Sequence, residues 1–197
     1  MRFGLALDKV YVSKIGKLWV VQNDLIQLSL DSERCWFDVL EKKSGVTWGH
    51  DPWVDTVGEL VLERKGDGAR LTVNLSDAEE KTISKIKNGL KVQLSKFKVN
   101  CESVDGSLTF QLVLPGGSEP EIKVEITDFQ LKDEKYSLNR IHLPSRSFYL
   151  RTAGDKGYLV IPIGMGSILP VGQATQTPNQ VIPAGSHALH TAPFTAE

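Results

Sequence analysis

The sequence predicts an all-β protein, a large antiparallel β-sandwich of two sheets, and three observations predict this fold class. About a dozen short segments place apolar residues at every second position, which is the period of a strand with one buried face. Gly, Asn, Asp and Pro residues separate these segments at regular intervals. No segment keeps a helical period beyond two turns, so a sandwich is favoured over alternating strands and helices.

The first part of the chain is expected to form a meander of antiparallel strands. Residues 1–16 show no clear period, and we expect either an arm or a first edge strand there. Three short strands are expected next, at residues 17–22, 25–30 and 35–40. Asn23 and Asp24 supply the turn between the first two strands. Such short connections favour antiparallel neighbours, because a parallel pair needs a long crossover.

The middle of the chain predicts further strands and one well-defined hairpin. Apolar residues alternate at residues 57–64 and 71–75, and the polar residues 76–80 have room for a single helical turn. Asn88 and Gly89 favour positive φ angles, so they predict a type I′ turn. After this turn the apolar parity changes at Ser95 and Lys96, which predicts a β-bulge or a bend.

The last strands are expected at residues 108–114, 122–126 and 129–143, with a loop at 132–134, and then at 147–151 and 158–163. The polar, glycine-bracketed residues 152–157 predict a hairpin loop between the final two. The segment 158–163 is apolar on both parities, as in a strand buried on both faces. We therefore expect a β-sandwich domain over residues 1–170, followed by a linker or tail over 171–197 that leads to a catalytic domain if the chain is part of a longer protein.

Composition narrows the classes of partner. The 197 residues carry a formal net charge of −1, which gives no long-range field toward nucleic acid or an anionic membrane. Six lysines in residues 81–98 are interpreted as a solvated, edge-protecting face. No signal peptide or membrane span is recognised, so we expect a cytoplasmic protein, or an extracellular one if its signal has been removed. The oligomeric state is left open.

Chemistry-bearing residues are sparse. Cys35 and Cys101 are interpreted as buried thiols, with a disulfide left open, and no Cys or His pair has the spacing of metal ligands. His187 and His190 lie in the Ala, Thr and Pro-rich tail, where no helix is expected. We expect no metal and no cofactor, and we assign no catalytic residue.

One polar and aromatic cluster comprises Trp48, His50, Asp51 and Trp53. Tryptophans on a loop offer flat faces to the C–H side of a sugar ring, while His50 or Asp51 bonds its hydroxyls. The alternative is structural: the indoles cover an open end of the sandwich, and Asp51 with Pro52 makes a turn. These four residues are the candidate carbohydrate-binding residues.

The order of segments also resembles a known family. The stretch VVQNDLIQLSLDSERCWFDVLEKKSGVTWGHDPW, with Phe37, Val39, Gly45 and Trp48 in matching places, resembles the opening of the β-supersandwich domain that precedes the catalytic barrel of many glycoside hydrolases. That domain is similar in fold to galactose mutarotase. The late stretch RIHLPSRSFYLRTAGDKGYLVIPIGMGSILP is similar to the end of such domains. The resemblance covers residues 17–170.

The resemblance implies a protein related to carbohydrate. Its first implication is a non-catalytic N-terminal accessory domain that supports a catalytic barrel and shapes carbohydrate binding, so this chain alone is not expected to be an enzyme. The alternatives are a stand-alone carbohydrate-binding module and an aldose epimerase like the mutarotases, which use a Glu base and a His acid. His142 lies on an expected strand, but its surroundings do not match the mutarotase motifs.

Overall fold

The computed structural model describes residues 9–50, 56–99, 102–117, 119–145, 157–161 and 167–171. The chain divides into two units, Met1–Tyr149 and Leu150–Glu197, and each is described by itself. The described residues form antiparallel strands and one 3-10 turn, which confirms the predicted all-β class. None of their helices is long and apolar enough to cross a membrane.

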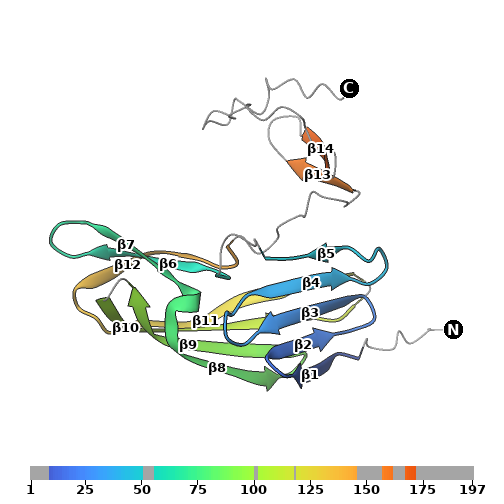
Figure 1. Cartoon of the computed structure of the whole chain (residues 1–197), viewed down its shortest axis with the longest axis horizontal. Coiled ribbons are helices and arrows are strands. Elements are labelled where there is room, and N and C mark those ends of the chain that lie inside the picture. Colours follow the sequence, from blue (N-terminus) through green and yellow to red (C-terminus); the bar gives the residue numbers. More distant parts are fainter. Residues whose placement is uncertain are drawn as a thin grey trace. The chain divides into compact units, whose positions relative to one another are not determined.

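The first unit begins with a five-stranded meander in which every strand pairs with the next (Figure 1). Its strands are β1 (Tyr11–Ile15), β2 (Leu18–Gln22), β3 (Ile26–Asp31), β4 (Phe37–Glu41) and β5 (Thr47–Trp48). Strand β1 lies at the edge of this sheet. Of the two expectations for residues 1–16, an arm or a first edge strand, the structure therefore shows the edge strand. The predicted turn at Asn23 is confirmed, because its side-chain oxygen accepts hydrogen bonds from the backbone N–H groups of Leu25 and Ile26.

Two further sheets complete this unit. A four-stranded sheet has the order β11-β10-β9-β8 and a three-stranded sheet the order β12-β6-β7. Their strands are β6 (Glu59–Arg64), β7 (Arg70–Asn74), β8 (Ala78–Ile86), β9 (Gly89–Val99), β10 (Glu102–Val113), β11 (Lys123–Leu131) and β12 (Tyr136–His142). The 3-10 turn η1 (Leu75–Asp77) joins β7 to β8, within the polar segment where the sequence allows a helical turn. Hydrogen bonding thus divides the unit into three sheets, where the sequence predicts two.

The core lies between the sheets. Buried apolar side chains from all three of them form one cluster, and Figure 1 shows the five-stranded sheet lying over the four-stranded one. The predicted alternation is confirmed on β3, where Ile26, Leu28 and Leu30 are buried and the intervening residues are half-buried. This sandwich-like packing leaves the opposite face of the five-stranded sheet outside the core.

The predicted hairpin and bulge are both present. Asn88 has a φ of 59° and lies between β8 and β9, so the hairpin is confirmed. Gly89 begins β9 without a positive φ, so the predicted type I′ turn, which needs two successive positive φ angles, is wrong. Lys96 has a φ of 56°, and the register with β10 shifts between Val104 and Ser107. At this bulge the single residue Lys96 of β9 lies opposite two residues of β10, Asp105 and Gly106, and Phe97 faces the core although it has the opposite parity from Leu94.

In the second unit, β13 (Gly157–Ile161) pairs antiparallel with β14 (Ser167–Val171). Strand β13 matches the apolar segment predicted at residues 158–163. Its expected partner at residues 147–151 lies outside the described residues, and the partner that the structure shows is β14. The predicted domain boundary after residue 170 stays a prediction.

Candidate functional site

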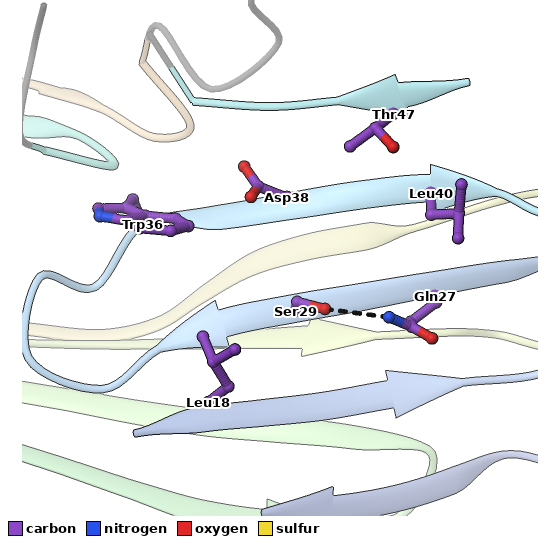
Figure 2. A pocket seen from close by; sticks show the side chains of 7 residues that line it. All are labelled: Leu18, Gln27, Ser29, Trp36, Asp38, Leu40 and Thr47. Carbon is purple, nitrogen blue, oxygen red and sulfur yellow. Dashed lines mark hydrogen bonds between the residues drawn. The ribbon is translucent and has the colours of Figure 1, made fainter. Parts of the chain in front are cut away.

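A shallow depression of about 280 Å³ lies on the face of the five-stranded sheet that points away from the core (Figure 2). Seven residues line it, namely Leu18, Gln27, Ser29, Trp36, Asp38, Leu40 and Thr47. They come from strands β2 to β5 and from the segment just before β4. We call this feature the Trp36 depression.

Strand alternation explains why these residues share one face. Phe37 and Val39 of β4 are buried in the core, so Asp38 and Leu40 between them point the other way. The register places Ser29 opposite Asp38. In the same way, Leu40 lies between Gln27 of β3 and Thr47 of β5. Side chains directly opposite each other on neighbouring strands are close enough to touch. The register of β3, β4 and β5 therefore determines which side chains line the depression together.

Trp36 provides a flat aromatic surface. The imidazole of His50 stacks on one face of its indole, with the ring centroids 3.7 Å apart and the planes inclined by 21°. Figure 2 shows the indole nearly edge-on, with Leu18 and Ser29 on one side of its plane. The indole Nε1 is buried and has no hydrogen-bond partner in the part of the chain that the structure describes. His50 takes one of the two faces of the indole, and the other has no aromatic partner among the described residues.

Asp38 is tied to the same histidine. Its Oδ1 accepts a hydrogen bond of 3.0 Å from the backbone N–H of His50, and the Nδ1 of His50 lies 3.0 Å from the same oxygen. Gly49 allows the backbone to pass close to the Asp38 carboxylate, since a Cβ at residue 49 would lie only 3.2 Å from Oδ1. No described residue hydrogen-bonds Oδ2. His50 therefore holds one carboxylate oxygen in place, whereas no described residue constrains the other.

The lining of the depression combines one charged side chain with neutral polar and apolar ones. Asp38 is the only charged residue among the seven that line it, and Gln27, Ser29 and Thr47 add neutral donors and acceptors. A His-Asp pair serves catalysis when it activates a nucleophile, but no hydroxyl of the described residues hydrogen-bonds to His50. No group of three or more His, Cys, Asp or Glu side chains in the described residues is placed to hold a metal ion.

The four predicted site residues are placed as follows. His50 joins the depression through Trp36 and Asp38. Trp48 of β5 pairs with the buried Val39 of β4, and its half-buried side chain packs against the core cluster. Asp51 and Trp53 lie outside the described residues. The described half of the predicted cluster is thus divided between the core face and the outer face of the sheet.

The sequence contained a signal for the residues that were missed. Trp36 and Asp38 alternate with the buried Cys35 and Phe37, so their outward parity is readable from the sequence. A large aromatic residue on the solvent side of a strand is an unusual feature. The stacking of His50 on Trp36 was not readable, because it depends on where the chain goes after β5.

A second polar pair lies on the three-stranded sheet. The Nδ1 of His142 lies 3.6 Å from a carboxylate oxygen of Glu59, its cross-strand neighbour, and Arg140 lies near the other ring nitrogen. Both side chains of the pair are about one third exposed, at 37% and 31%. A Glu base and a His acid of an epimerase must stand on either side of a sugar, whereas these two groups contact each other.

No protein-family model and no curated protein sequence matches the chain.

Proposed function

We propose that the chain is a galactose-mutarotase-like β-supersandwich domain, the non-catalytic N-terminal accessory part of a glycoside-hydrolase-like protein, and that it binds carbohydrate at the Trp36 depression. The resemblance over residues 17–170 and the antiparallel all-β fold support this proposal. Catalysis then belongs to a barrel domain in the longer protein, and this domain shapes the substrate cleft. The proposed partners are a carbohydrate and that barrel.

The observation that carries the proposal is the indole of Trp36 set beside polar groups in a depression. A sugar ring has an apolar C–H side, which stacks on an aromatic face, and a rim of hydroxyls, which need hydrogen-bond partners. The indole supplies the first, while Asp38, Gln27 and Ser29 supply the second. His50 packs behind the indole and limits its movement, so that less side-chain entropy is lost on binding.

Apolar residues beside the depression support the accessory role. Tyr11, Ile15 and Leu18 are 52%, 69% and 39% exposed, and the register of β1 and β2 places them on the outer face of the sheet. Exposed apolar residues gathered on one face are typical of a surface that another protein domain covers. A barrel seated there would bring its cleft close to the sugar held at Trp36.

Titration calorimetry on the purified chain with a panel of oligosaccharides tests the proposal. At least one glycan is expected to bind, with about tenfold or greater loss of affinity in Trp36→Ala and little loss in Trp36→Phe, which keeps an aromatic face. The matched control is Trp19→Ala, because Trp19 packs against the core. Binding that is unchanged in Trp36→Ala, or absent for every glycan, would overturn the proposal.

The accessory role is tested separately from binding. Extension of the chain into its downstream barrel is expected to give glycosidase activity, and the substitution Ile15→Lys is expected to lower that activity by weakening the contact between the domains. If the domain instead acts as a stand-alone module, it should bind glycan with the same affinity with and without the downstream sequence. Ile15→Lys should then have no effect on activity.

The epimerase alternative can be tested at His142 and Glu59, the His and Glu side chains that contact each other on the three-stranded sheet. Polarimetry on a freshly dissolved aldose measures anomer exchange directly. We expect the chain to leave the rate unchanged, because the two groups contact each other and leave no space between them for a sugar. Acceleration by the wild-type chain that is lost in both His142→Ala and Glu59→Gln would establish the epimerase instead.

A further inference from the structure

We propose that the Trp36 depression selects a sugar that carries a protonated amino group over the N-acetylated, neutral and acidic forms of the same sugar. This inference rests on the proposed function, because it concerns the ligand class of the same site. It follows from the charge, the aromatic surface and the size of the depression.

The charge of the site is negative and uncompensated within its lining. Asp38 is the only charged residue there, and no lysine or arginine lines the depression. The carboxylate is 30% exposed, so it is partly removed from solvent. His50 holds Oδ1, which leaves Oδ2 as an acceptor for a ligand. A hydrogen bond between an ammonium and a carboxylate is about twice as strong as one between neutral groups, so an amino group gains most at this position.

The indole of Trp36 favours the same ligand. The face of an indole carries negative electrostatic potential and attracts a cation within about 6 Å of the ring, more strongly than a phenyl ring does. Trp36 directly precedes β4 and Asp38 lies in it two positions later, a spacing of about 7 Å in an extended chain. A sugar ring stacked on Trp36 therefore brings one of its substituents to Asp38.

The size and the remaining polar groups define the rest of the ligand. A volume of about 280 Å³ lies just below the roughly 300–1,000 Å³ of pockets that enclose drug-sized ligands, so the depression has room for one or two sugar rings. Gln27 and Ser29 are neutral and serve hydroxyls. A uronic acid or a sulfated sugar would place a second negative charge beside Asp38 with no cation in the lining to balance it.

Calorimetry compares four ligands of equal length with the full chain: glucosamine oligomers, their N-acetylated forms, neutral glucose oligomers and oligouronates. The buffer keeps the amino groups protonated. We expect the glucosamine oligomers to bind at least tenfold more tightly than the N-acetylated ones and to lose affinity as salt is raised.

The variant Asp38→Asn removes the charge while keeping the shape and the oxygen that bonds to His50. It is expected to lower glucosamine affinity at least tenfold, and to lower the affinity for the N-acetylated oligomer by much less. Asp24→Asn, an exposed carboxylate of the same sheet, is the matched control and should have no effect. If circular dichroism shows that Asp38→Asn does not fold, the salt dependence of glucosamine binding by the wild-type chain tests the inference instead. Affinity that does not fall with added salt would then overturn it.

The outcomes separate the inference from the proposed function. Neutral or N-acetylated oligomers that bind as tightly as glucosamine oligomers, with no salt dependence, would overturn the amino-sugar preference and leave the carbohydrate site standing. Absence of binding by all four ligands would overturn both.

Discussion

The hydroxyl of Tyr136 donates a hydrogen bond of 2.8 Å to the carboxylate of Glu102. Tyr136 begins β12 of the three-stranded sheet, and Glu102 begins β10 of the four-stranded sheet, so the bond joins two sheets that share no backbone ladder. Arg64 of β6 also approaches Glu102, at 3.6 Å. The hydrogen bond to Glu102 raises the pKa of Tyr136, because ionisation would place two negative charges in contact.

The Tyr136→Phe variant is expected to lower the free energy of unfolding by about 1–2 kcal/mol, since it removes a hydrogen bond to a charged acceptor from a buried side chain. Denaturant titration measures the change, and a double-mutant cycle with Glu102→Gln isolates the contribution of the pair. Tyr11→Phe is the control, because Tyr11 is 52% exposed. A Tyr136→Phe change no larger than that of the control would show that the bond contributes nothing to stability.

Gly89 is required at the start of β9 by a close backbone approach. A Cβ there would meet the carbonyl oxygen of Leu112 and would lie 2.9 Å from the Cα of Val113. We expect Gly89→Ala to destabilise the protein by about 3 kcal/mol, because two paired strands would have to separate. Thermal unfolding measures it. The neighbouring Asn88→Gly is the control and should be tolerated, since Asn88 has a φ of 59°. Equal melting temperatures for the wild type and Gly89→Ala would refute the close approach.

Phe110 is among the largest fully buried side chains, and it lies in β10 at the centre of the four-stranded sheet. Phe110→Ala is expected to cost about 3–5 kcal/mol through lost burial and the cavity that it leaves. Gln111→Ala, the next residue on the opposite face, should stay within about 0.5 kcal/mol. Denaturant midpoints of the two variants test the assignment of faces, and similar values would mean that the faces are assigned wrongly.

Cys35 is a free, fully buried thiol, and burial raises its pKa from 9.0 to about 11. The neutral thiol is therefore favoured in the folded state, and its contribution to stability is present below pH 9 and is lost as the pH rises through 11. We expect the wild type to lose about 2 kcal/mol more than Cys35→Ala between pH 8 and 11. Denaturant titrations across this range measure it, and parallel pH profiles would contradict it. Cys101 lies outside the described residues.

Gly49 positions Asp38 in the candidate site. A methyl group at residue 49 would press on Oδ1 of Asp38 and displace the carboxylate from the backbone N–H of His50. We expect Gly49→Ala to weaken sugar binding several-fold with little loss of stability. Calorimetry and thermal unfolding on the same sample give both quantities. Ser13→Ala, at an exposed position of the same sheet, serves as the control. Unchanged affinity would show that Asp38 does not need this placement.

Most of the local structure was predictable because its causes are local. The alternation of Ile26, Leu28 and Leu30 fixed which face of β3 is buried, and Asn88 determined the position of the hairpin. The change of parity at Lys96 located the bulge without knowledge of any partner strand. In each case the physical requirement involves residues within one or two strands.

What could not be predicted depends on distant contacts. Strand β12 pairs with β6, about 75 residues earlier in the chain, and no local pattern specifies that choice. In the candidate site, the outward parity of Trp36 was readable, whereas its contact with His50 depends on the path of the chain beyond β5. Asp38 could be placed on the outer face but not identified as the partner of His50.

The unequal count at the bulge, where Lys96 lies opposite both Asp105 and Gly106, constrains the length of the coding sequence more than its composition. Loss of the Lys96 codon would leave a regularly alternating strand, so Phe97 would still point inward, but it would come opposite Gly106 instead of Val104. Every later pair between β9 and β10 would be displaced with it. Related sequences are therefore expected to keep the length of this segment, and to carry at position 96 a residue that tolerates a positive φ angle, such as Gly or Asn.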